Sequence, residues 1–291
     1  MVMNNSIFSD PQKPLEWPQV EQHIQLAASA FYEYRYLPVS KRIAFLTAIA
    51  VELAEFRENL IDACNRETYL PVGRLHGELD RTTNQIYLFV SLLKEGAWVN
   101  AIIDTGIPDR HPVARPDIRQ MQLPLGPVCV YGASNFPFAF SVVGGDTVSA
   151  LAAGCSVIYK VHPSQPQTAY LTAICIERAA RKTEMPTGVF ASLFVASLEI
   201  GLQIVSHPLI KAVGFTGSFN GGKALFDAAV RRPEPIPVYA EMSSINPVFI
   251  LPGQLAGNAE SIASTLVASN VLGAGQFCTN PGLIIMIGSE N

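Results

Sequence analysis

The chain has 291 residues, a formal net charge of −4 and only 15% charged residues, against roughly 25% in typical soluble domains. This length supports one large or two ordinary domains, and the apolar composition excludes a disordered chain. The acidic balance provides no basic surface for a phosphate backbone, so nucleic acid is not an expected partner.

Two long stretches, 120–145 and 261–289, carry no formal charge and raise the question of a membrane span. Prolines and polar side chains interrupt both, so we expect buried globular core and no membrane partner. The first 18 residues lack the basic and apolar regions of a secretion signal. The five cysteines form no Cys-x-x-Cys pair, which argues against a metal site or a disulfide framework and predicts a cytoplasmic protein.

The N-terminal part of the chain is expected to be helical. Between residues 20 and 93, apolar residues recur at helical spacing, which predicts three or four amphipathic helices, with Ser40 as the N-cap of the second. Residues 101–124 contain spaced prolines, and polar and apolar side chains alternate around Arg119 and Met121. This pattern predicts an extended arm or edge strand.

After Gly126, short apolar runs alternate with helical segments, which is typical of a parallel α/β fold. Helices are expected at about 143–153, 168–182, 198–206 and 221–230. Strands are expected at 128–131, 157–159, 189–194, 212–215 and 238–240, with 248–251 and 283–287 in a second sheet. Parallel sheets bind ligands outside the carboxyl ends of their strands, so the turns there are the first candidates for a site.

Two of these turns carry groups suited to binding. Asn135, in Gly-Ala-Ser-Asn-Phe-Pro, places an amide donor where a helix is about to start, a good position for stabilising an oxyanion. The alternative is an ordinary turn asparagine, which the local sequence alone favours. Gly217 and Ser218 precede Gly-Gly-Lys at 221–223, so N–H groups at a helix N-terminus could hold a pyrophosphate. The spacing is not that of a Walker loop, and a plain turn with a serine cap is an equal alternative.

Other candidates stand alone in the sequence. Lys160 follows a predicted strand where a ribose or phosphate would sit, although a solvated lysine is the simpler interpretation, and His162 beyond it is by itself a loop residue. Glu241 follows an apolar strand, where a carboxylate is either costly or functional. Cys278 lies in a glycine-flanked loop, where chemistry and packing are equal alternatives. Three other cysteines fit a small-core role: Cys129, Cys155 and Cys175.

Taken in order, these motifs resemble the aldehyde dehydrogenase superfamily from about residue 26 to the end of the chain. The stretches 133–137, 232–238 and 277–282 look closest to the branch that oxidises 2-oxoglutarate semialdehyde (2,5-dioxopentanoate). The resemblance implies a Rossmann-type parallel-sheet α/β domain and an incomplete second α/β catalytic domain. The implied division is 1–100 for the N-terminal helices, 101–125 for a bridging arm, 126–241 for the nucleotide-binding domain and 242–291 for the start of the catalytic domain.

The resemblance also implies an NAD(P)-dependent oxidation of a small-molecule aldehyde to a carboxylic acid through a cysteine thiohemiacetal and thioester. Cys278 matches the nucleophile, Asn135 the oxyanion donor and Glu241 the general base that activates water. Lys160 matches the residue at the adenosine ribose, and Gly217 with Ser218 the pyrophosphate turn.

The sequence departs from the family pattern in three places. Lys-Val-His-Pro at 160–163 replaces the common Lys-Pro-Ser-Glu, so the acid that would hold the ribose is absent. We therefore expect NADP, with Lys160 and His162 near its 2′-phosphate, and NAD as the alternative. Met-Ser-Ser after Glu241 replaces Leu-Gly-Gly, which narrows the space beside the base and adds hydroxyls.

The third departure is the end of the chain at Asn291, where the family continues with the rest of its catalytic domain. We expect a C-terminally truncated chain that is inactive alone, and a homo-oligomer for the full-length enzyme. The alternative is a short, catalytically inactive relative that binds a nucleotide or a partner. The intact Cys278, Glu241 and Asn135 favour the enzyme.

Overall fold

The computed structural model describes residues 13–195 and 197–287, and its N-terminal part is helical as predicted. Four helices occur, α1 (Trp17–Tyr34), α2 (Val39–Glu55), α3 (Arg57–Thr68) and α4 (Val72–Glu95), and the short η1 (Ala97–Val99) follows them. The predicted Ser40 cap is wrong. Pro38 takes the N-cap position because its φ of −53° and ψ of 144° set the entry to α2, which places Ser40 inside the first turn.

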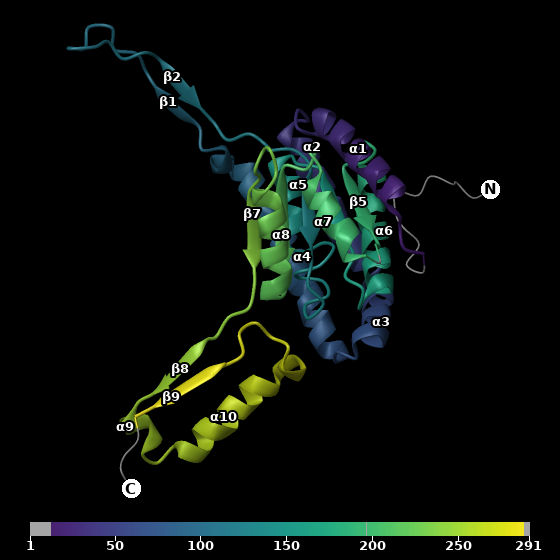
Figure 1. The fold of residues 1–291 in the computed structure, drawn as a ribbon, viewed down its shortest axis with the longest axis vertical. Coiled ribbons are helices and arrows are strands. Elements are labelled where there is room, and N and C mark those ends of the chain that lie inside the picture. The colour runs from purple at the N-terminus through teal and green to yellow at the C-terminus, as the bar shows by residue number, and fades with distance from the viewer. Residues whose placement is uncertain (1–12, 196, 288–291) are drawn as a thin grey trace.

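The predicted arm is an antiparallel ribbon that projects from the body (Figure 1). Its strands are β1 (Ile102–Asp104) and β2 (Ile118–Gln120), and every residue of both is exposed. The ribbon therefore offers free strand edges to solvent.

Five parallel strands form the central sheet in the order β5-β4-β3-β6-β7. The strands are β3 (Val128–Tyr131), β4 (Val157–Lys160), β5 (Phe190–Leu193), β6 (Ala212–Thr216) and β7 (Val238–Glu241). The connecting helices are α5 (Gly145–Ala153), α6 (Pro166–Lys182), α7 (Leu198–Ser206) and α8 (Phe219–Val230). Every predicted strand and helix of this region is present, within a few residues of its expected bounds. The chain order reverses between β3 and β6, which is where doubly wound sheets form their ligand crevice.

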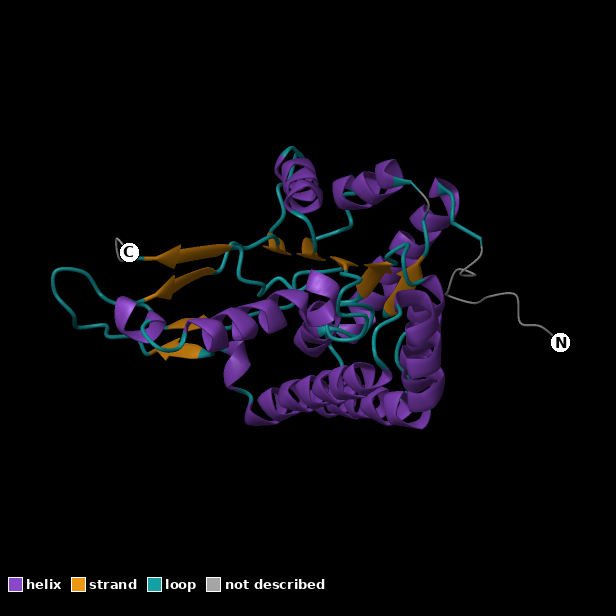
Figure 2. Ribbon diagram, turned by 90° about the horizontal axis from the view of Figure 1, so that it is seen from below, coloured by secondary structure: helices purple, strands orange, loops and turns teal. Residues whose placement is uncertain are grey.

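Helices lie on both faces of the sheet (Figure 2). The strands β3 and β5 are buried at every position, whereas Tyr239 and Glu241 of β7 are exposed. Along β3, Val128 and Val130 face the core formed with α2, α4, α5 and α6, whereas Cys129 and Tyr131 face the core formed with α1 and α7. Cys155 and Cys175 are also buried, which confirms the core role predicted for these cysteines. No helix in the described residues is long and apolar enough to cross a membrane.

The remaining elements form a second, parallel pair of strands with its own helix. These elements are β8 (Pro247–Ile250), α9 (Pro252–Leu255), α10 (Ala259–Val271), η2 (Leu272–Gly275) and β9 (Leu283–Met286). The predicted burial of 261–289 is wrong over its described part, because α10 has no buried residue and β9 is exposed at every position. A side chain is buried between packed layers, and the described residues place no further layer over this unit. Residues 288 and 289 lie outside the described part.

Candidate functional site

Asn135 lies in a tight loop between β3 and α5 rather than at a helix start, because α5 begins only at Gly145. The loop closes on itself where the Ala133 N–H donates to the Phe140 carbonyl at 2.8 Å. A Cβ on Gly132 would lie 2.7 Å from that carbonyl and 2.4 Å from the Tyr159 hydroxyl, so the turn requires glycine. The backbone thereby presents Asn135 on the carboxyl side of the sheet.

The loop of Cys278 meets the loop of Asn135. Asn135 Nδ2 donates to the Gln276 carbonyl at 2.7 Å, and the rings of Phe136 and Phe277 lie 4.7 Å apart. Cys278 is exposed, whereas the other four cysteines are buried. A primary amide has two N–H groups, so Asn135 keeps one donor for another acceptor while the first fixes its orientation.

The backbone of Cys278 is held by side chains that the sequence analysis missed. Asn246 Nδ2 donates to the Cys278 carbonyl at 2.6 Å and to the Asn280 carbonyl at 3.0 Å. The hydroxyl of Ser244 donates to the same Cys278 carbonyl. Asn246 has a φ of 48°, and the dipeptide Asn246-Pro247 is a turn signal that could have marked it.

Glu241 ends β7, where it pairs with Thr216 of β6 and is exposed. Ser244 is the third residue after it, so the chain can separate the two by about 10 Å at most. The structure therefore joins Asn135 to the Cys278 loop by a direct hydrogen bond, and Glu241 to the same loop through the short segment that ends in Ser244.

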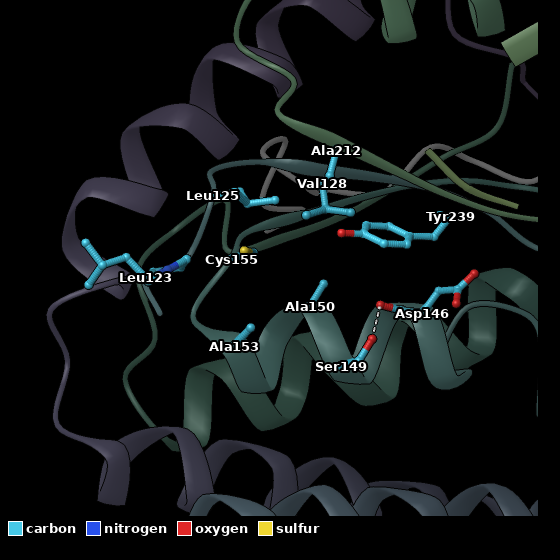
Figure 3. Close-up of a pocket in the computed structure, with 12 residues that line it drawn as sticks. Leu123, Leu125, Val128, Asp146, Ser149, Ala150, Ala153, Cys155, Ala212 and Tyr239 are labelled. Atoms are coloured by element: carbon cyan, nitrogen blue, oxygen red, sulfur yellow. Dashed lines mark hydrogen bonds between the residues drawn. The ribbon is translucent and has the colours of Figure 1, made fainter. Parts of the chain in front are cut away.

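A cavity of about 310 Å³ lies between α5 and the strands β3, β6 and β7 (Figure 3). Tyr239 and Gly214 line it, and they are partners in the sheet. Side chains two residues apart on a strand share a face, so Glu241 stands on the same side of β7 as Tyr239. Asp146, at the start of α5, also lines the cavity, and burial raises the pKa of its carboxyl. Glu241 thus faces the side of the sheet to which the Asn135 loop leads.

Lys160 is the last residue of β4, and His162 follows in the loop. Burial lowers the pKa of Lys160. Burial and the charge of Lys160 lower the pKa of His162, which accepts a hydrogen bond from the Ser164 N–H at 3.2 Å through Nδ1. At neutral pH His162 is therefore uncharged, so Lys160 is the cation of this turn.

Ser218 is the N-cap of α8, and its hydroxyl accepts from the Gly221 N–H at 3.2 Å. The helix begins at Phe219, two residues before the predicted start, so the N–H groups of Phe219 and Asn220 have no intrahelical partner. A Cβ on Gly217 would lie 2.8 Å from the Phe215 ring, so a larger residue at this position would collide with that ring. Lys160 and Phe215 flank Tyr131 in register, so they are two strand spacings, or about 10 Å, apart.

Comparison with known proteins places these residues within a protein family. The model of the aldehyde dehydrogenase family matches residues 14–289, which is nearly the whole chain. The chain belongs to the aldehyde dehydrogenase family. The family and the Rossmann-type α/β fold class expected from the motifs are thereby confirmed.

Two curated relatives of the family are alike in length and identity. The "Alpha-ketoglutaric semialdehyde dehydrogenase 2" of Azospirillum brasilense is 50% identical over 288 residues, 96% of this chain and 55% of the relative. The "Alpha-ketoglutaric semialdehyde dehydrogenase" of Acinetobacter baylyi is 48% identical over 271 residues, 93% of this chain and 51% of the relative. The chain spans about half the length of the curated relatives it matches.

Solved aldehyde dehydrogenase structures share the fold. The glyceraldehyde-3-phosphate dehydrogenase GapN of Methanocaldococcus jannaschii, solved with NADP, aligns with a TM-score of 0.78 at 22% identity, over 94% of this chain and 56% of that one. An NAD-dependent benzaldehyde dehydrogenase of Corynebacterium glutamicum aligns with a TM-score of 0.77 at 24% identity, over 94% of this chain and 56% of that one.

Proposed function

We propose that the chain carries the nucleophile, the oxyanion donor and the nucleotide-binding sheet of an NAD(P)-dependent aldehyde dehydrogenase. The observation that supports this most directly is the 2.7 Å hydrogen bond from the Asn135 amide to the Gln276 carbonyl, which brings the predicted oxyanion donor to the loop of the predicted nucleophile. The names of the two curated relatives support 2-oxoglutarate semialdehyde as the substrate.

Each predicted catalytic residue then has a chemical task. The Cys278 thiolate attacks the aldehyde carbon, and the free N–H of the Asn135 amide, with the Cys278 backbone N–H, stabilises the oxyanion that forms. A bound NAD(P) would supply the hydride acceptor that the oxidation of the thiohemiacetal requires. Glu241 takes a proton from the water that attacks the resulting thioester, which releases the carboxylic acid and the thiol.

The residues of the β4 and β6 turns fit a dinucleotide. The free N–H groups at the start of α8 suit a pyrophosphate, and glycine at position 217 avoids a clash with the Phe215 ring. Lys160 supplies the cation at the ribose, and Pro163 places no carboxylate against a 2′-phosphate. We therefore propose NADP as the cofactor, with NAD as the alternative.

We also propose a location, an assembly and a domain division. Free thiols on all five cysteines support a cytoplasmic location. The exposed edges of the β1–β2 ribbon support a homo-oligomer in which the ribbon pairs with another subunit. The division at residues 100, 125 and 241 stays a prediction, with the central sheet assigned to nucleotide binding and 242–291 to the catalytic domain.

The proposal is tested by Cys278→Ala in the complete product of the gene that encodes this chain, with Cys155→Ala as the matched control. We expect Cys278→Ala to abolish the first-turnover burst of NADPH with 2-oxoglutarate semialdehyde and to keep NADP binding within about two-fold, since only the covalent route is lost. Cys155→Ala should keep the burst. Turnover by Cys278→Ala within a few-fold of the parent would show that another group reacts.

A further inference from the structure

Helix α4 presents two charged side chains, one helical turn apart, to the Asn135 loop. Glu78 Oε1 accepts from the N–H groups of Phe138 at 2.8 Å and Ala139 at 3.0 Å. Arg74 Nη2 donates to the Asn135 backbone carbonyl at 2.5 Å. The helix therefore holds both ends of the segment 135–139, and neither contact belongs to the chemistry described above.

Arg74 also reaches the loop of Cys278. Its guanidinium carbon lies 5.1 Å from the centre of the Phe136 ring and 4.7 Å from that of Phe277, and the two rings are 4.7 Å apart. The three groups form a closed triangle, here called the Arg74 cluster. Phe136 follows Asn135 and Phe277 precedes Cys278, so the cluster joins the backbone beside both predicted catalytic residues.

The charged side chains that α4 presents are largely withdrawn from water, which strengthens their contacts. The side chain of Arg74 is 18% exposed and that of Glu78 is 3% exposed, with 3.9 Å between Nη2 and Oε2. A cation over an aromatic face and a charged donor to a carbonyl both gain strength when water is excluded. A flexible apolar side chain at position 74 could fill the space but could not bind the carbonyl and both rings at once.

We propose that Arg74 is a positioning residue that fixes the Asn135 amide relative to Cys278, an assignment that rests on the proposed function. An oxyanion donor acts only within about 2.7–3.1 Å of the developing charge, and a 1 Å displacement costs about 10²-fold in rate. The contacts of Arg74 run to backbone and rings, so it acts through Asn135 and Phe277 rather than on the substrate.

The test compares three variants in the complete gene product: Arg74→Met, Arg74→Lys and the control Arg81→Met. Arg81 is a matched control because its guanidinium lies 5.7 Å from the centre of the Phe136 ring and 5.2 Å from that of the Phe140 ring. In the described part of the chain, its ring contacts do not extend to Phe277.

The measurements are the first-turnover rate, kcat and KM for 2-oxoglutarate semialdehyde and for a neutral aldehyde of similar length. NADP affinity, Tm, and hydrogen exchange of the segments 133–140 and 274–282 are recorded for the same variants.

We expect Arg74→Met to lower the first-turnover rate about 10²-fold with both aldehydes, with KM and NADP affinity within about three-fold of the parent. Exchange in both segments should rise together, Arg74→Lys should recover part of the rate because its charge remains, and Arg81→Met should resemble the parent. A loss confined to KM for the carboxylate-bearing aldehyde would overturn the proposal in favour of substrate binding. Equal losses in Arg81→Met, or a lower Tm with no exchange change in the two segments, would overturn it in favour of general packing.

A different result would contradict the proposed function. A parent protein that shows no Cys278-dependent burst with either aldehyde contradicts the proposed dehydrogenase. The exchange measurement still tests whether Arg74 links the two loops. Faster exchange of both 133–140 and 274–282 in Arg74→Met, and not in Arg81→Met, supports this link. Unchanged exchange in Arg74→Met refutes it.

Discussion

At the residue scale, the turn after β4 carries one cation and no acid. Lys160 is partly buried at the strand end, His162 is neutral, and Pro163 is exposed beside them. A carboxylate at position 163 would repel a 2′-phosphate and could accept hydrogen bonds from ribose hydroxyls. The selectivity between the two nucleotides should therefore respond to this single position.

We predict that Pro163→Glu shifts the ratio of kcat/KM for NADP over NAD by about ten-fold toward NAD, equivalent to about 1.4 kcal/mol. The control is Ser164→Glu, which places the same charge at the next exposed position. Steady-state kinetics with both nucleotides in the complete gene product give the ratio. An unchanged ratio in Pro163→Glu, or an equal shift in the control, would exclude position 163 as the selector.

The sequence identified the candidate residues for the proposed chemistry. It did not identify the side chains that hold the backbone beside those residues. Asn135 and Cys278 stand in motifs with recognisable neighbours, so residue type and order were sufficient. Arg74 and Asn246 act through contacts that span 61 and 32 positions, and no local pattern encodes such contacts. Nor does the sequence show the burial that lowers the pKa of His162.

At the element scale, the central sheet was predicted well because its strands are short apolar runs separated by helical segments. Burial of α10 and β9 was predicted wrongly, since an apolar composition shows what an element tolerates and not whether another layer covers it. In β9 the exposed fractions are 46% for Leu283, 39% for Ile284, 37% for Ile285 and 56% for Met286. An uncharged apolar strand of this kind pairs readily with other chains.

We predict that the 291-residue chain self-associates through β9 and that Ile285→Lys reduces this association. A charge in the middle of the strand opposes pairing and sheet stacking. Val113→Lys is the control, because Val113 is 71% exposed and lies outside any strand, so it adds the same charge elsewhere. Light scattering at several protein concentrations should show several-fold less aggregate for Ile285→Lys alone. The same improvement in Val113→Lys would point to net charge rather than to β9.

At the scale of the whole molecule, the described chain has a well-buried body and a C-terminal unit with little burial. Figure 1 shows this unit beyond β7, apart from the helices around the central sheet. Two apolar cores enclose the central sheet, whereas only Ile250 is buried among the described residues beyond β7. Segments with few buried contacts open at low free-energy cost, so the loop of Cys278 belongs to the part of the fold that opens most easily. The turns at Lys160 and Ser218, which we propose to bind the nucleotide, belong to the stable body.

This difference leads us to predict that the 291-residue chain binds NADP weakly and has no measurable dehydrogenase activity by itself. The reaction of Cys278 with the aldehyde requires the distance between the Asn135 amide and Cys278 to stay constant to within a fraction of an ångström. A loop that opens locally does not keep this distance. The measurement is aldehyde-dependent NADPH and NADH formation by a gel-filtered, monodisperse fraction, with hydrogen exchange recorded on the same sample. We expect protection in the strands β3 to β6 and rapid exchange over residues 259–287. A monodisperse fraction that turns over aldehyde, and in which those residues are protected, would show that the described contacts suffice to fix the Cys278 loop and that the prediction is wrong.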